Sequence, residues 1–285
     1  MISTVVLMLL CSTAVTAQIN LGERALGAVQ KGLTSLTFSD EDAAALSKQA
    51  VDQMDKENKV ADAKDKYAIR LNRVFGKHAK EDGLALNYKV YLVKDVNAFA
   101  TADGSVRVFS GLMDIMDDNE LLAVIGHEIG HVANSDSRDA IRSAYQKEAL
   151  IDAAASQSDK VAAVTDSQLG KIANALIDSK HSRKQETDAD TYSYDFMKRH
   201  GYNVNAVESA FNILAKMSEG QDSSVITRMM SSHPDPKQRA ENAKKRAQEE
   251  GLYKGYVKQP VKPVKAATPT KTKKATGKKK TSKKK

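Results

Sequence analysis

Between residues 39 and 80, apolar positions recur at intervals of three and four residues, which is the spacing of one face of an α-helix. Ser39 precedes three acidic residues, a pattern typical of a helix N-terminus because the hydroxyl can cap free backbone amides. An earlier stretch, residues 23–36, has the same periodicity. The pattern therefore predicts a helical N-terminal region over residues 18–84.

The period changes to two at residues 85–94, where apolar side chains alternate with polar ones as in a half-buried strand. Two shorter apolar runs, 99–102 and 106–109, flank Asp103 and Gly104. An Asp-Gly pair is a strong signal for a β-hairpin turn. We therefore expect a small antiparallel sheet in this part of the chain.

Helical spacing returns after Ser110. Asp117 and Glu120 resemble a capping box that opens an apolar run. Further helices are predicted at about 138–155, 167–199, 205–219 and 235–250. The expected fold class is α+β: a mostly helical core over residues 85–250, with the small antiparallel sheet or hairpin beside the helix that follows Asp117.

The charge of the chain is concentrated at its C-terminus. The last 35 residues, 251–285, contain 13 lysines and no acidic residue, so the net charge of +8 becomes −5 for residues 1–250. Proline, threonine, alanine and lysine dominate this tail, which predicts a disordered segment. Its expected partner is an anionic envelope surface. Nucleic acid is disfavoured, because the chain lacks tryptophan and only 5% of its residues are aromatic.

The first 17 residues contain no charged side chain, have a short apolar stretch and end in small residues, as a secretory signal peptide does. Cleavage before Gln18 would leave a protein without cysteine, because Cys11 is the only one. An N-terminal core helix is one alternative. Lipidation of Cys11 is another, although Leu10 stands where a small residue is preferred. We predict an exported protein of the periplasm or cell envelope, with outer-membrane association left open.

The helix after Asp117 carries His127-Glu128-Ile129-Gly130-His131. Residues four apart share a helix face, so both histidines can offer nitrogens to one metal ion while Glu128 lies beside the open coordination position. The alternative is a surface helix with solvated side chains. The apolar neighbours oppose it, because a buried glutamate between two buried histidines requires a compensating charge, which a dication provides.

A catalytic zinc ion usually has three protein ligands and a water. A metzincin would place its third histidine at position 137, which is serine here, so that class is excluded. The remaining candidates are Glu186, Asp188 and Asp190, of which one would bind the metal and another would hydrogen-bond a ligating histidine. Spacing alone does not choose among them, and an acidic helix face is the plain alternative.

Four segments in this order resemble the HtpX and CAAX prenyl protease family of zinc metallopeptidases over roughly residues 85–245. They are Asn97-Ala98-Phe99-Ala100 through Gly111-Leu112, the segment Gly126 to His131, Glu186-Thr187-Asp188-Ala189-Asp190, and Ser232-His233-Pro234-Asp235-Pro236 with Arg239. The chain lacks long hydrophobic spans and is similar in this to the soluble exported members, the LoiP and BepA type.

The resemblance implies a zincin-like catalytic core with one Zn²⁺ per chain and a role for each matching residue. The implied ligands are His127, His131 and Glu186, the implied catalytic residues are Glu128 as general base and His233 as a donor near the substrate carbonyl, and the implied supporting or substrate-binding residues are Asp190, Arg239 and Asn97. Asp188 departs from the glutamate that the family usually has there. His78, His181 and His200 lie among charged neighbours and are predicted to be solvated.

These observations predict a zinc-dependent metalloendopeptidase acting on proteins or peptides. The resemblance implies misfolded or mislocalised envelope proteins as substrates. The alternative is an exported zinc-binding chaperone or scaffold that holds unfolded chains without cutting them. An intact Glu128 favours the peptidase, because structural zinc sites are closed by a fourth protein ligand and need no base. The oligomeric state is left open.

Overall fold

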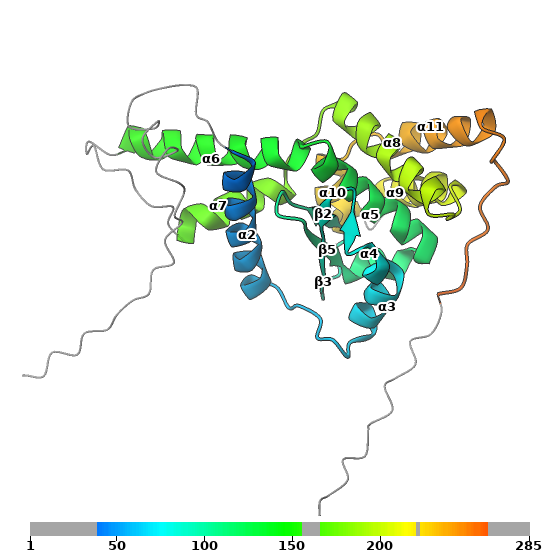
Figure 1. Ribbon diagram of the computed structural model, residues 1–285, viewed down its shortest axis with the longest axis horizontal. Coiled ribbons are helices and arrows are strands. Elements are labelled where there is room, and N and C mark those ends of the chain that lie inside the picture. The colour runs from blue at the N-terminus through cyan, green and yellow to red at the C-terminus, as the bar shows by residue number, and fades with distance from the viewer. Residues whose placement is uncertain (1–38, 156–165, 221–222, 262–285) are drawn as a thin grey trace, which may run out of the picture.

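The computed structural model describes residues 39–155, 166–220 and 223–261. Its helices are α2 (Asp40–Glu57), α3 (Lys66–Phe75), α4 (Ser110–Ile115), α5 (Asp118–Ala133), α6 (Asp136–Ala155), α7 (Asp166–Ile177), α8 (Arg183–Arg199), α9 (Asn205–Ser218), α10 (Thr227–Ser232) and α11 (Pro236–Glu249). Two short 3₁₀ helices are η1 (Gly76–His78) and η2 (Ser223–Ile226). The strands are β1 (Lys80–Glu81), β2 (Leu84–Ala85), β3 (Asn87–Tyr91), β4 (Ala98–Ala100) and β5 (Ser105–Phe109). The expected mostly helical α+β fold is confirmed (Figure 1).

The main sheet has three strands in the order β3-β5-β4. The predicted hairpin is confirmed, because β4 and β5 pair antiparallel and Gly104 in their turn has a φ of 81°, which favours glycine. The expectation of a wholly antiparallel sheet is wrong, because β3 pairs with β5 in parallel. The chain after β3 passes to the far edge before β5 fills the centre, so β3 and β5 run in the same direction. β1 and β2 form a separate antiparallel pair.

Local signals placed most helix starts correctly. Ser39, Asp117 and Ser182 each form a capping box. The helix predicted over 167–199 is two helices, because the chain breaks between α7 and α8 and Ser182 caps the second. The helical stretch predicted to about residue 80 is likewise divided into α2 and α3. The signal peptide and the helix predicted at 23–36 lie outside the described residues.

Helix α5 runs through the core and packs closely against α8 (Figure 1). Every residue of α5 from Glu120 to Val132 is buried. Glycines on α5 permit the approach: a Cβ added to Gly130 would lie 3.0 Å from the Cα of Ala189, and one added to Gly126 would lie 3.2 Å from the Phe196 ring. The two helices that carry the predicted metal ligands are therefore held at near backbone contact.

Helix α2 is attached to the sheet through buried charge. Asp55 accepts two hydrogen bonds from the guanidinium of Arg107, which is 2% exposed, at 2.8 and 3.0 Å. Lys89 and the Tyr91 hydroxyl also donate to Asp55. Burial alone would raise the pKa of Asp55, but these hydrogen bonds lower it to about 2.

The chain after α11 continues as an extended segment, residues 252–259, here called the C-terminal strap. Tyr256 and the backbone amide of Gln259 donate to Asp117 Oδ2 at 2.6 and 2.7 Å, and Lys258 lies 3.3 Å from Glu120. Asp117 and Glu120 are fully buried and cap α5. The disorder predicted from Gly251 onward is therefore wrong for the strap, whose apolar residues pack on the core: Leu252, Tyr253 and Tyr256. Residues 262–285 lie outside the described part.

Asp55→Asn should lower the free energy of unfolding by about 3 kcal/mol at pH 7, because it leaves buried Arg107 without its counter-charge. The lowered pKa means that the carboxylate stabilises the fold above about pH 4, and that its contribution is lost as the pH falls through about 2. Urea unfolding at several pH values tests this. Equal stability of both proteins at pH 7 would contradict it.

Deletion of residues 252–285 should lower the melting temperature by about 5 °C, because the capping carboxylate of Asp117 loses two donors. Deletion of residues 262–285 alone keeps the strap and serves as the matched control. Thermal circular dichroism compares the two. Identical melting temperatures would show that the strap does not stabilise α5.

Candidate active site

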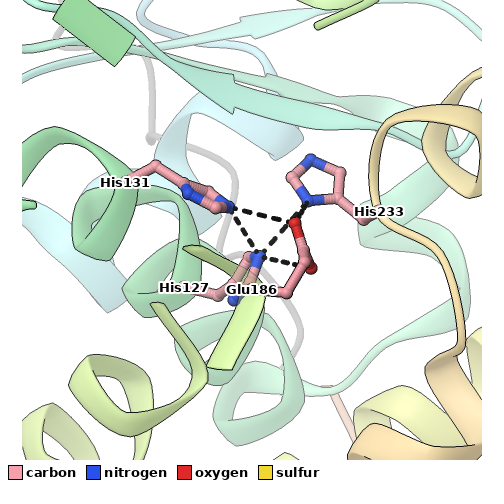
Figure 2. Close-up of side chains that lie close together, drawn as sticks. All are labelled: His127, His131, Glu186 and His233. Carbon is pink, nitrogen blue, oxygen red and sulfur yellow. Dashed lines mark hydrogen bonds and ion pairs between the residues drawn. The ribbon is translucent and has the colours of Figure 1, made fainter. Parts of the chain in front are cut away.

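Helix α5 presents His127 and His131 on one face, with their Nε2 atoms 3.1 Å apart (Figure 2). The outward Nδ1 atoms each contact a carboxylate: His127 lies 2.9 Å from Asp190, and His131 lies 2.9 Å from Asp136. A carboxylate that accepts Nδ1–H fixes the tautomer in which Nε2 carries a lone pair. Both lone pairs therefore face the same point.

Glu186 reaches that point from α8 (Figure 2). Its Oε1 lies 3.4 Å from His131 Nε2, and its Oε2 lies 3.5 Å from His127 Nε2. Ligands at about 2.0–2.1 Å around a tetrahedral ion are about 3.3 Å apart, so these separations fit one metal ion of zinc size. Asp188 is instead exposed and paired with Lys184. Of the three acidic candidates, Glu186 is the one that the fold brings to the two nitrogens.

His233, at the C-terminal end of α10, completes a group of four. Its Nδ1 lies 3.0 Å from Glu186 Oε1 and 3.3 Å from His127 Nε2 (Figure 2). The ring therefore occupies the fourth corner of the cluster, whereas the family resemblance implied a donor near the substrate carbonyl.

Glu128 lies one step around α5 from the ligand cluster and is 3% exposed. Its Oε1 has no hydrogen-bond partner among the described residues, and the nearest ring nitrogen, His233 Nε2, is 3.7 Å away. Burial raises the pKa of Glu128. The carboxylate borders a cavity of about 20 Å³, room for one water, which it shares with His131 and His181. An unpaired buried acid beside such a cavity is what a general base requires.

Arg239, on α11, lies behind the ligands rather than on the cavity side. Its guanidinium is 2.6 Å from Asp190 and 2.7 Å from Glu186 Oε2, and it stacks on Phe211. Although burial raises the pKa of Glu186, hydrogen bonds from the neighbouring imidazoles and the charge of Arg239 hold it well below its ordinary range. Arg239 thus supports the carboxylate of Glu186, the predicted ligand.

Asn97 lies outside the cluster, at the start of β4. Its Oδ1 accepts a hydrogen bond from the amide of Ala98, and its Nδ2 has no partner within the described residues although the residue is 2% exposed. The structure therefore places Asn97 at the edge of the sheet, away from the metal ligands.

Two residues that the sequence analysis did not select belong to the site. Asp136, the first residue of α6, orients His131 and accepts a hydrogen bond from Gln185 at 2.9 Å. His181, predicted to be solvated, is half-buried and stacks on His131 with ring centroids 3.8 Å apart. An acidic residue close after the second histidine was the available signal for Asp136, since ligating histidines usually donate to one.

Burial and charge together fit a dication. His127 has its pKa lowered to about 3 by burial and by Arg239, which keeps the ring neutral and able to ligate. For His131, burial is outweighed by Asp136 and Glu186, which raise its pKa to about 9, so this ring would release a proton from Nε2 on binding a metal ion. Two buried nitrogens, one ionised carboxylate and a further buried acid are a donor set for a zinc-type ion.

Comparison with known proteins identifies the family. The model of peptidase family M48 matches residues 66–247. The chain belongs to peptidase family M48. It is therefore a metalloendopeptidase, an enzyme that uses a metal ion to hydrolyse peptide bonds within proteins. The predicted family resemblance is confirmed.

Two relatives cover most of the chain. Metalloprotease LoiP of Escherichia coli strain K12 is 41% identical over 217 residues, which are 76% of this chain and 84% of LoiP. Metalloprotease YcaL of the same strain is 39% identical over 223 residues, which are 77% of this chain and 86% of YcaL. Protease HtpX of Xanthomonas euvesicatoria pv. vesicatoria is 45% identical over only 65 residues, 21% of this chain and 22% of HtpX. Among the described helices, none combines the length and hydropathy needed to cross a membrane.

Asp136→Asn should weaken metal binding by about 10- to 100-fold, because His131 loses the acceptor that orients it. Asp188→Asn removes an exposed carboxylate from the neighbouring helix and is the control, with unchanged affinity expected. Competition with a chromogenic zinc chelator measures both. Wild-type affinity in Asp136→Asn would show that this contact does not support the centre.

Proposed function

We propose that the protein is a zinc-dependent metalloendopeptidase that cleaves unfolded segments of other proteins. The ligands are His127, His131 and Glu186, and Glu128 is the general base. The observation that carries the proposal is the spacing of three ligand atoms for one ion beside buried Glu128, whose Oε1 has no hydrogen-bond partner in the described part of the chain. Membership of family M48 supports it.

When bound, zinc supplies a water with a pKa of about 7 and polarises the scissile carbonyl. Glu128 would take a proton from the attacking water and pass it to the leaving amine. Burial raises the pKa of Glu128, which favours its acceptance of a proton. Asp190 and Asp136 hold the two imidazoles in the ligating tautomer throughout.

Strand β4 offers a place for an extended substrate. Backbone hydrogen bonds join β5 to Asn97 and Thr101, so in the alternating antiparallel pattern Ala98 and Ala100 turn their polar groups to the other edge. That edge borders the cavity at Glu128. A peptide added there as a strand is bound through its backbone, which favours unfolded chains over particular sequences.

The edge is already occupied by the protein's own groups. Ser137 donates to the carbonyl of Ala100, and Asn97 accepts from the amide of Ala98. The cavity of about 20 Å³ also has Ile177 and His181 on its wall, and it is too small for a peptide. Substrate entry therefore requires the segment between α7 and α8 to move.

His233 is assigned the role of donor to the developing oxyanion. This role requires its ring to leave the fourth corner, where Nδ1 now lies 3.0 Å from Glu186. An oxyanion donor of this kind contributes about 3 kcal/mol to a transition state.

The finer proposals concern place and substrate. An uncharged stretch at residues 1–17 supports export to the periplasm or cell envelope, where misfolded or mislocalised proteins would be the substrates. The lysines of the last 35 residues would favour an anionic envelope surface, including that of the outer membrane.

A zinc-binding chaperone or scaffold is the second candidate, and one observation favours it. With His233 the cluster has four protein ligand atoms within 4.8 Å of one another, as in a closed structural site. Glu128 favours the peptidase, because a structural site needs no unpaired acid beside it.

Glu128→Gln should lower the cleavage rate of casein by at least about 100-fold and leave zinc content unchanged, because it keeps the side-chain shape and removes the proton acceptor. Asp188→Asn should cut as the wild type does. A chelator should stop the wild-type reaction. Retained cleavage in Glu128→Gln would refute the base assignment, and zinc binding without any cleavage by wild type would favour the scaffold.

A further inference from the structure

A second group of metal-binding side chains lies at the opposite end of α8. His78 comes from η1, Glu81 from β1, and His200 caps the C-terminus of α8. His78 Nδ1 lies 3.2 Å from Glu81 Oε2, and His200 Nε2 lies 2.9 Å from Glu81 Oε1. One ligand atom from each of the three residues falls within 4.8 Å of the others.

We propose that His78, Glu81 and His200 form a second metal site for a zinc-class divalent cation, with a structural role. Two imidazole nitrogens and one carboxylate are the donors that suit Zn²⁺, Ni²⁺ or Cu²⁺, whereas Mg²⁺ and Ca²⁺ prefer oxygen alone. The proposal stands independently of the catalytic function.

The surroundings of His78 match those of the ligands at the first centre. Its outer nitrogen, Nε2, lies 2.7 Å from the Tyr202 hydroxyl, which fixes the ring and directs Nδ1 toward Glu81. His127 and His131 are likewise held by a polar contact at the ring nitrogen that faces away from the cluster. His78 is 2% exposed and Glu81 7% exposed, so both are held in place.

His200 provides the open side of the group. Its side chain is 31% exposed, which leaves access for an ion from solvent and room for a water as a fourth ligand. As the C-cap of α8 it lies at the end where helix carbonyls carry partial negative charge. That charge favours a bound cation.

Arg199 is the competitor for the same carboxylate. Its Nη2 lies 3.0 Å from Glu81 Oε1 and equally 3.0 Å from Asp82 Oδ2. The side chain is 44% exposed, so it can keep its pair with Asp82 when Glu81 turns to a metal. Without a metal, the same atoms form a hydrogen-bonded network centred on Glu81, and the experiment must separate these two cases.

The position gives the site its role. A metal there would join η1 and β1 to the C-terminal end of α8, whose N-terminal half carries Glu186 and Asp190. At about 1.5 Å per residue, the two centres are roughly 20 Å apart along one helix. The second ion would therefore hold α8 in place without contacting the substrate.

Zinc content after equilibrium dialysis of purified full-length protein tests the proposal. His200→Ala should bind one zinc fewer per chain than wild type and should still cleave casein if wild type does. Its melting temperature should no longer rise with the last equivalent of zinc. The criterion is the difference in zinc content between wild type and His200→Ala. This difference is expected even if the first centre binds no zinc.

Arg199→Gln tests the same site without removing a ligand. Loss of the competing cation should tighten binding of the second zinc several-fold, whereas a hydrogen-bonded network alone predicts no change. Equal zinc content in wild type and His200→Ala would overturn the proposal. Unchanged zinc affinity in Arg199→Gln would also count against the proposal. This test keeps all three proposed ligands, so it does not depend on whether His200→Ala folds.

Discussion

Gly130 of α5 lies against Ala189 of α8 so closely that a Cβ at position 130 would approach the Ala189 Cα to 3.0 Å. This contact sets the distance between the two helices, and the separation of the predicted ligand atoms depends on that distance. One helix supplies both histidines, the other supplies Glu186 and Asp190, and neither could be moved outward by the width of a methyl group without separating the ligand atoms. A small residue in the motif is thus a packing requirement of the chemistry.

The same close packing concentrates buried charge. Glu128, Glu186 and Arg239 are each at most 6% exposed, and Asp190 lies directly behind them. Such a group is costly to bury unless the charges compensate one another. Arg239 neutralises part of the acidic charge, and a divalent cation at the cluster would neutralise more. The Oε1 of Glu128 makes no hydrogen bond to the described residues and lies 3.7 Å from His233 Nε2, so the charge of Glu128 is compensated less directly than that of Glu186.

The position of His233 links the two functional interpretations. In the fourth corner of the cluster, His233 makes the site resemble a closed structural zinc site. Glu128 beside it has the burial and the free Oε1 expected of a general base. The small cavity and the segment between α7 and α8 enclose the same side of the centre.

The sequence by itself determined what short-range interactions control. Capping boxes at Ser39 and Asp117 place helix starts, the Asp-Gly turn places the hairpin, and the spacing of His127 and His131 fixes two ligands on one helix face. Only the tertiary structure decided the parallel pairing of β3 and β5, the burial of His78, the half-buried position of His181 against His131, and which of the three acids left open by spacing meets the histidines, namely Glu186. These features depend on contacts between residues that are far apart in the sequence, which no local pattern specifies. The contacts form only when α5, α8 and the sheet pack around one core.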